Sequence, residues 1–388
     1  MSKYQLLQKQ GISLISLTNG PVNSMNLKLR TNFVTGLEQA IKDKSRAIVI
    51  VGDGRMFSAG SDIKEFALKR YNSTPSLVEI TKQLDSFNIP IITGMHGYAL
   101  GGGLEMALAS SHRVAASNTM LGFPEVGLGL LSGAGGTQRL PRLIGLEKSI
   151  ELLTTGKLIT SKAALDMGLI DHIIDTNSDA NSNASNVNAF NYDSFVKHII
   201  EYSISDTVQH VDLNSLRISN RSVENSMNQE DWDAMAGKIN KSARGNIAPI
   251  TIFNSIKAST TTPNTEHIGT NTTANVNNFA SGCGVEDAYM NVLMNSPQSR
   301  ALQYLFLSEK KSNNITDSFI NKIQNPKYAH NSTNSTNIKN TYDISNTIDT
   351  IGVIGGGTMG TGITMSCINA GIPVILVETT PDNVKMAY

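Results

Sequence analysis

Three consecutive glycines, Gly101, Gly102 and Gly103, constrain this chain more than any other feature of its sequence. They follow an apolar run at residues 89–100, which is typical of a buried strand, and they precede a helix-like stretch at residues 104–109. Glycine lets a ligand approach the backbone because no Cβ stands in the way. A helix N-terminus adds unpaired N–H groups and a partial positive charge. The turn is therefore a candidate site for an oxygen that gains negative charge.

Two glutamates fall near this turn. Glu105 lies in the first turn of the expected helix, and Glu125 follows Pro124 in a glycine-rich stretch at residues 122–136, which we expect to form a loop beside a pocket. Two carboxylates at one oxyanion site suit general acid–base chemistry on a carbonyl compound. The alternative is that Glu105 only interacts with the helix dipole and that Glu125 is a solvated loop residue.

A second stretch, residues 55–66, again places small residues after a short apolar strand, here at residues 47–51. With this stretch included, the sequence resembles the enoyl-CoA hydratase/isomerase (crotonase) family. Several matches in one order are a far more specific signal than any one motif. The matching motifs, in the family's order, are Phe57-Ser-Ala-Gly-Ser-Asp-Ile63, Ala99-Leu-Gly-Gly-Gly-Leu-Glu105, Phe123-Pro-Glu125, Gly133-Ala-Gly-Gly-Thr-Gln-Arg-Leu-Pro141 and Gly168-Leu-Ile-Asp171.

The resemblance implies an α/β fold built as a spiral of ββα units. It implies that the backbone N–H groups of Ser61 and Gly102 hold the thioester oxygen of an acyl-CoA, although most relatives have alanine in place of Ser61. Glu105 and Glu125 would then hold the water that adds to the double bond of trans-2-enoyl-CoA in fatty acid β-oxidation, with double-bond isomerisation as a second activity to consider. His96 has no role in the family motif, so we expect it to be structural. The residues implied to bind CoA are Ala59, Gly60, Asp62, Ile63 and Lys64.

The end of the sequence carries a different motif. A G-x-G-x-x-G pattern follows an expected strand at residues 348–354, and a helix at 362–370 and a strand at 373–377 follow it. This order predicts a dinucleotide site, and it resembles the start of a 3-hydroxyacyl-CoA dehydrogenase domain. The candidate NAD-binding residues are Gly355, Gly357, Gly360 and Glu378.

The chain stops at Tyr388, soon after the second of these strands. A dinucleotide domain needs further strands, so we expect an incomplete Rossmann unit that does not bind NAD tightly. Residues 284–311 resemble the segment that joins the hydratase and dehydrogenase halves of multifunctional β-oxidation enzymes. Three hypotheses remain open: a hydratase with a dehydrogenase stub, the N-terminal part of a bifunctional enzyme, and an acyl-CoA-binding protein without catalysis.

The composition of the chain gives no indication of a nucleic acid, membrane or metal partner. The formal net charge is +0 and the sequence pI is about 7.1, so no basic field favours nucleic acid. No apolar run is long enough for a membrane span. Only Cys283 and Cys367 are cysteines, and no motif suggests a metal. By resemblance we expect a monomer in the peroxisome, or otherwise in the cytoplasm because Met386-Ala-Tyr388 is not a targeting tripeptide.

Three segments rich in Asn, Ser or Thr interrupt the chain, and we predict that they are disordered because they have little apolar surface to bury. The expected organisation is a crotonase core at 1–176, an insertion at 177–191, helices of the same domain at 192–258, an insertion at 259–281, linker helices at 282–328, a polar linker at 329–347 and the truncated NAD-binding start at 348–388.

Overall fold

The structure is a computed structural model that describes residues 3–68, 72–175, 190–225, 227–260, 278–323 and 350–378. The chain divides into two units, Met1–Ser318 and Phe319–Tyr388. The insertion predicted at residues 177–191 falls mostly outside the described residues, as does the one at 259–281, and the linker at 329–347 does so entirely. Within the described parts, no helix combines the length and the apolar character needed to span a bilayer.

The first unit is built on a six-stranded sheet with strand order β1-β2-β3-β4-β6-β9. All neighbouring strands run parallel except β1 and β2, which form an antiparallel pair. Parallel strands covered on both faces need apolar side chains throughout, and every residue of β3 and β4 is buried. The strands are β1 Lys3–Leu7, β2 Ile12–Leu17, β3 Ala47–Gly52, β4 Ile91–Met95, β6 His112–Ala116 and β9 His172–Ile174.

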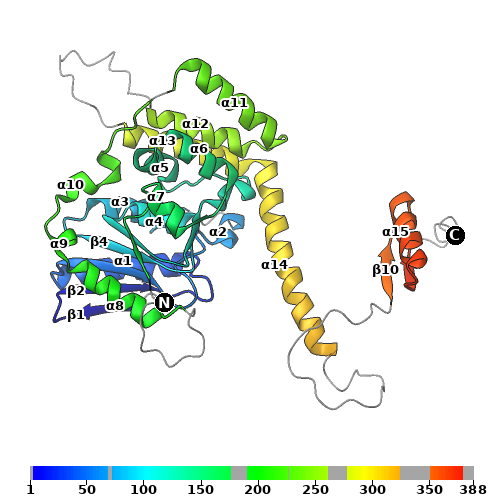
Figure 1. Cartoon of the computed structure of the whole chain (residues 1–388), viewed down its shortest axis with the longest axis horizontal. Helices are drawn as coiled ribbons and strands as arrows, with labels where there is room; N and C mark the ends of the chain where they lie inside the picture. Colours follow the sequence, from blue (N-terminus) through cyan, green and yellow to red (C-terminus); the bar gives the residue numbers. More distant parts are fainter. Residues whose placement is uncertain are drawn as a thin grey trace. The chain divides into compact units, whose positions relative to one another are not determined.

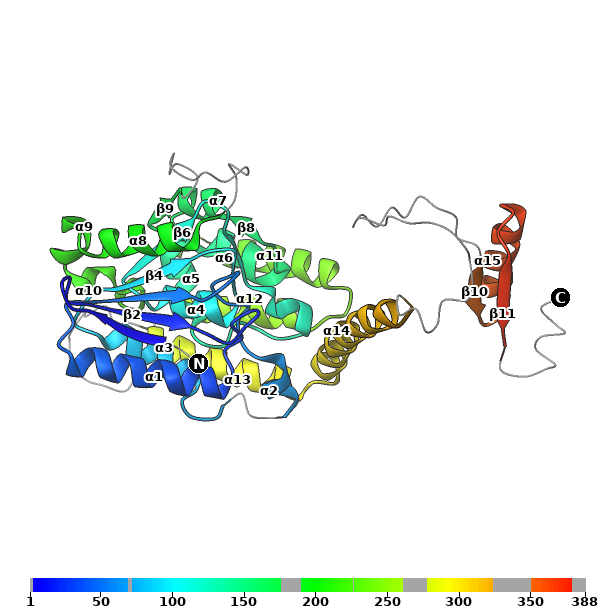
Figure 2. The same cartoon turned by 90° about the horizontal axis from the view of Figure 1, so that it is seen from below.

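Side chains of β3 alternate between two apolar clusters on opposite faces of the sheet. Ile48 and Ile50 belong to the larger cluster, while Val49 and Val51 belong to the smaller one. The helices α1 (Leu27–Lys42) and α8 (Tyr192–Ser203) cover these two faces, as Figure 2 shows. The sheet is therefore the centre of the first unit, and the larger cluster continues into the helices around the site.

The predicted strand at residues 89–100 is two strands. β4 ends at Met95, and β5 (Tyr98–Leu100) joins a second sheet with β7 (Met120–Gly122) and β8 (Ile159–Thr160). The break falls at Gly97, whose φ is +62° and whose missing Cβ leaves room for the Arg55 carbonyl oxygen. The chain then enters α4 (Gly102–Leu108), which completes a β-β-α unit.

Most of the remaining helices of the first unit lie around these strands, whereas α14 extends away from them (Figure 1). The stretch at 122–136 is not all loop, because Pro124 begins a short 3-10 helix. The helices are α2 Ile63–Ala67, α3 Leu77–Ser86, η1 Pro124–Leu128, α5 Gly136–Ile144, α6 Leu146–Thr155, α7 Ser161–Asp166, α9 Asp206–Gln209, α10 Leu213–Leu216, η3 Ile218–Asn220, α11 Gln229–Ala243, α12 Ala248–Lys257, η4 Ala258–Thr260, α13 Phe279–Asn295 and α14 Pro297–Ile323.

The edges of two predicted insertions are ordered elements. The Phe190 ring stacks on His96 with ring centroids 5.0 Å apart, and the Asn191 side chain caps α8 by accepting from Ser194 N–H. Ser259 is buried in η4, and α13 already begins at Phe279. Phe190 and Asn191 thus have partners in the fold, a stacked ring and a capped helix.

The second unit is a strand–helix–strand unit. β10 (Ile351–Ile354) and β11 (Val374–Val377) pair in parallel, and α15 (Thr358–Asn369) connects them. The helix begins four residues before the predicted start at residue 362, immediately after Gly357. Gly360 has no room for a Cβ because the Gly355 carbonyl oxygen occupies that position, so the motif's last glycine permits close packing of helix on strand.

Candidate active site

The glycine turn before α4 is shaped by its close neighbours. Gly101 has φ +49° and ψ −126°, and a Cβ at this position would collide with the Glu125 carboxylate. Only glycine fits such a turn without strain. The turn thus brings the start of α4 directly against Glu125 of η1, although 24 residues separate Gly101 from Glu125 in the sequence.

The ends of two strand segments run side by side at this turn. Leu100 N–H donates to Ser58 O at 3.0 Å, and Ser58 N–H donates to Tyr98 O at 3.1 Å. This pairing places the residues that follow each segment together: a Cβ on Gly102 would lie 3.4 Å from Ser61 N. Neither Ser61 N–H nor Gly102 N–H is used in a backbone hydrogen bond between the described elements. The two predicted oxyanion donors are therefore adjacent and available.

Glu105 is buried, with 3% of its surface exposed, in the first turn of α4. Its Oε1 accepts from Ala134 N–H at 2.7 Å and from Gly136 N–H at 2.8 Å. Burial raises the pKa of this carboxyl to about 7, and the two N–H donors and the Arg139 guanidinium oppose the rise. Glu105 is consequently a carboxyl that can gain or lose a proton near neutral pH.

Glu125 has a different environment. Part of the residue reaches solvent, but its Oε2 is buried and has no hydrogen-bond partner among the described residues. Burial and then the negative charge of Glu105 raise the pKa of Glu125 to about 8. Two adjacent carboxyls that cannot both ionise easily titrate as a pair, so one of them holds a proton at neutral pH.

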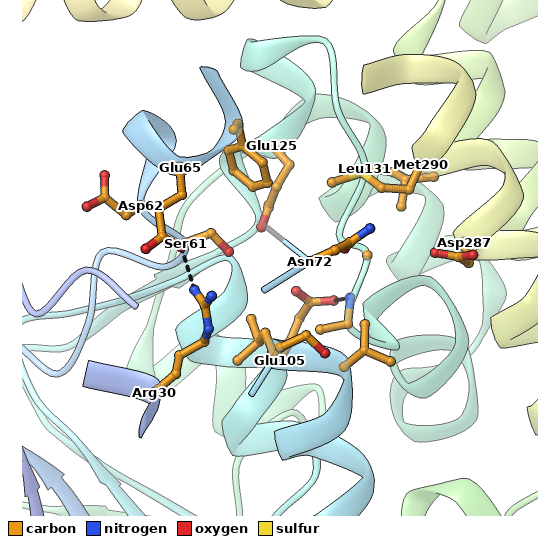
Figure 3. Close-up of a pocket in the computed structure, with 16 residues that line it drawn as sticks. Arg30, Ser61, Asp62, Glu65, Asn72, Glu105, Glu125, Leu131, Asp287 and Met290 are labelled. Atoms are coloured by element: carbon orange, nitrogen blue, oxygen red, sulfur yellow. Dashed lines mark hydrogen bonds and ion pairs between the residues drawn. The ribbon is translucent and has the colours of Figure 1, made fainter. Parts of the chain in front are cut away.

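One pocket brings Ser61, Asp62, Glu105 and Glu125 together, and Gly102 is not part of its lining (Figure 3). Glu105 and Glu125 point into it from opposite walls, with Ser61 on one side and Leu131 and Met290 on the other. Its cavity volume of about 60 Å³ is enough for water, which needs roughly 10–15 Å³ of such space. The remaining residues that line it are Arg30, Asp62, Glu65, Phe66, Asn72, Ser76, Leu77, Val78, Gly133, Ala134 and Asp287.

The predicted CoA-binding residues lie along the chain beside this pocket. Asp62 lines the pocket and also caps α2, accepting from Lys64 N–H at 3.0 Å. Ala59 and Gly60 are held by backbone hydrogen bonds to Val22 and Met25. Lys64 is exposed, and Ile63 begins α2. Their contacts with CoA stay a prediction.

His96 does not line the pocket. Its ring is buried, with Nε2 2.9 Å from the Gly54 carbonyl oxygen and one face against Phe190. Burial lowers the pKa of His96, which favours the neutral ring. Its Nδ1 is buried without a hydrogen-bond partner among the described residues, and the ring lies away from the pocket, which agrees with the structural role expected for it.

Sequence reasoning does not identify three other side chains at or next to the site, Arg30, Glu65 and Glu286. Arg30 forms an ion pair with Glu65 at 2.7 Å at one side of the pocket, and neither position carries a local motif. Glu286 of α13 lies behind the Glu105 loop and is 2% exposed. The segment around Glu286 was noted only as a linker, and nothing in its local pattern indicated a buried carboxylate.

The dinucleotide motif forms the expected local geometry in the second unit. Gly355 has φ +94°, Gly357 precedes the first turn of α15, and Glu378 follows the end of β11. The Glu378 carboxylate accepts from Gly356 N–H, so the acidic residue lies against the glycine turn. A glycine turn at a helix N-terminus with an acid at the next strand's end fits a dinucleotide.

The sequence matches two families. Residues 7–191 match the enoyl-CoA hydratase/isomerase family, and residues 350–388 match the NAD binding domain of 3-hydroxyacyl-CoA dehydrogenase. A probable enoyl-CoA hydratase of Bacillus subtilis (strain 168) is 41% identical over 176 residues, which are 44% of this chain and 68% of that protein. The chain belongs to the enoyl-CoA hydratase/isomerase family.

A longer relative matches nearly the whole chain. The peroxisomal bifunctional enzyme of Danio rerio is 31% identical over 381 residues, which cover 98% of this chain and 45% of that protein. The chain thus spans about half the length of this relative. An enoyl-CoA hydratase/isomerase structure from Pseudoalteromonas atlantica T6c has a TM-score of 0.52 and 17% identity, covering 79% of this chain and 97% of that one. The predicted crotonase-type fold is confirmed by this likeness and the family match.

Proposed function

We propose that the first unit hydrates trans-2-enoyl-CoA to 3-hydroxyacyl-CoA. The observation that carries the proposal is the pairing of two unlike carboxyls, Glu105 and Glu125, across one small cavity beside the Ser61 and Gly102 N–H groups. Hydration needs a base for the attacking water and an acid for the carbon beside the thioester. It also needs donors for the thioester oxygen, which becomes negative as the enolate forms.

The environments of the two carboxyls assign their roles. Glu105 has two N–H donors and the lower pKa, so it is ionised and takes a proton from water as the water oxygen bonds to C3. Glu125 has a buried oxygen without a partner and the higher pKa, so it keeps its proton and gives it to C2. The enolate oxygen is meanwhile held by the Ser61 and Gly102 N–H groups. Overall, one C–O and one C–H bond form, while the C=C π bond of the enoyl group and one O–H bond of water break. Glu105 gains the proton of the water, and Glu125 gives its own proton to C2.

The direct experiment follows the loss of conjugated-thioester absorbance when purified chain is added to trans-2-enoyl-CoA. Turnover that disappears in the Glu105→Gln and Glu125→Gln variants supports the proposal. A folded chain that binds the thioester without turnover would instead favour the acyl-CoA-binding alternative.

A second proposal concerns residues 350–378, which we infer to be the start of an NAD site. NAD would bind with its pyrophosphate at the turn of Gly355, Gly357 and Gly360 and with a ribose at Glu378. Bound NAD would supply a hydride acceptor for 3-hydroxyacyl-CoA, the product of the first reaction. The names of the longer relatives also support a peroxisomal location for this chain.

A further inference from the structure

Two buried carboxylates share the loop that leads into α5. Ala134 N–H and Gly136 N–H donate to Glu105, while Gly135 N–H and Thr137 N–H donate to Glu286 at 2.6 and 2.9 Å. Four successive N–H groups therefore alternate between the two acids. Gly135 has φ +97° and ψ 8°, a left-handed turn of the kind that lets consecutive N–H groups surround anions.

Glu286 is built into this position from several sides. It lies on α13, 149 residues along the chain from Thr137, and is 2% exposed. The Thr137 hydroxyl also donates to its carboxylate, and the same hydroxyl is bonded to Ser255 Oγ of α12 at 2.7 Å. Burying a carboxyl group costs free energy unless it is hydrogen-bonded. An apolar residue would fill the same space at a lower cost, so packing alone is a weak explanation for Glu286.

We propose that Glu286 is a positioning residue for the hydratase site, because it fixes the loop so that Ala134 and Gly136 keep their N–H groups on Glu105. The effect on catalysis rests on the proposed function. The hydrogen bonds between the loop and Glu105 do not, because they are present whatever reaction the protein performs. Glu286 does not line the pocket, so it acts only through Glu105.

Glu286 and Glu105 are buried acids that titrate as a pair. Burial and then the charge of Glu105 raise the pKa of Glu286 to about 8, and its Thr137 and Gly135 donors oppose the rise. The structural link between the two acids is the loop whose N–H groups they share. The other titratable or charged groups facing this region are Glu125 of η1, Lys82 and Asp85 of α3, Arg139 and Arg142 of α5, and Cys283 of α13, while α12 contributes the uncharged Ser255.

The test is a titration of the Glu105 carboxyl itself. The full chain is labelled with carbon-13 at the glutamate side-chain carboxyls, and the Glu105 signal is assigned by its loss in Glu105→Gln. In Glu286→Gln one loop N–H loses its acceptor, the loop relaxes, and the donors to Glu105 weaken. We expect the Glu105 titration to move to higher pH by about one unit, the size typical of interacting carboxyls. Because no substrate is present, this readout is independent of whether the protein hydrates enoyl-CoA.

Glu286→Asp separates position from acidity, since aspartate keeps a carboxyl group but is too short to hold both N–H groups. We expect it also to raise the Glu105 titration, with kcat about tenfold lower and KM within about twofold for both variants. The matched control is Glu147→Gln, the same chemical change at an exposed glutamate of α6, which should change nothing.

Two results in folded Glu286→Gln would overturn the proposal. A Glu105 titration that does not move would mean that Glu286 serves only packing. A titration that moves to lower pH would mean that the charge of Glu286 acts directly on Glu105. If the Glu286 variants do not fold, the Glu105 titration is measured in Thr137→Val and Thr137→Ser instead. Valine removes the hydroxyl that donates to Glu286 and should raise the titration, whereas serine retains it and should not. Equal titrations in these two variants would count against the proposal.

Discussion

At the scale of single residues, Glu105 and Glu125 differ because their surroundings supply different numbers of donors. Glu105 accepts two backbone N–H groups, and Glu125 has a buried oxygen with none among the described residues. We expect Glu105→Gln and Glu125→Gln each to lower hydration by at least about 10²-fold, the usual contribution of a general acid or base. Binding of the thioester should persist, as calorimetry with a non-hydratable acyl-CoA would show. Near-normal turnover in either variant would remove that residue from the mechanism.

The pH dependence follows from the same two carboxyls. The rate should rise with pH as Glu105 loses its proton near its pKa of about 7, and fall as Glu125 loses its proton near about 8. Both shifts are upward, so kcat should peak between these values rather than at mildly acidic pH. The profile of kcat against pH in Glu125→Gln should lose its alkaline limb. A plateau from pH 5 to 7 in the wild-type chain would contradict the assignment of Glu105 as base.

Glu105 and Glu125 could be found from the sequence because each lies in a short motif with glycine or proline beside it. Glu286 could not, since its contacts are with residues about 150 positions earlier and depend on how α13 packs. Arg30 and Glu65 were missed for the same reason: their pairing across 35 positions exists only in the folded chain. Local chemistry is visible in one sequence, whereas partnership between distant segments is not.

At the scale of elements, the proposed role of the start of α4 is to supply the Gly102 N–H group to the thioester oxygen. Gly102→Pro removes this donor, while Gly102→Ala keeps it, and both add a Cβ that must displace the Leu77 side chain. The proline variant should therefore lose about 10²-fold more kcat than the alanine variant, the effect of one oxyanion donor. Ser61→Ala should be milder than either, because the donor there is also backbone. Steady-state kinetics on the three variants makes the comparison.

If Ser61→Ala proved the most damaging of the three, the Ser61 hydroxyl would have a role of its own. The apolar pattern otherwise predicts elements closely where it is clear, as for β3 and β11. The single strand expected at residues 89–100 failed because the bend at His96 and Gly97 occurs between residues that are all compatible with a strand. The bend itself depends on the close approach of the Arg55 carbonyl, which a local pattern does not reveal.

At the scale of the whole molecule, the second unit has a nucleotide motif but exposes much of its apolar surface. Ile354 is 89% exposed and Met359 is 81% exposed, and Ile375 of β11 is 61% exposed. A strand–helix–strand unit with so little buried surface is marginal by itself. We expect the 388-residue chain to bind NADH weakly, without saturation at micromolar concentration in a fluorescence titration. Saturable micromolar binding would show that this unit is competent as it stands.

The position of α13 has a consequence for where the hydratase can be cut. The match to the enoyl-CoA hydratase/isomerase family ends at residue 191, so the helices that follow lie outside it. Yet α13 supplies Met290 to the pocket wall and Glu286 to the loop that holds Glu105. A protein shortened to residue 260 would keep both proposed catalytic carboxyls and still lose the support behind one of them. We therefore expect that a shortened chain keeps the proposed site intact only if it extends at least to Asn295, the end of α13.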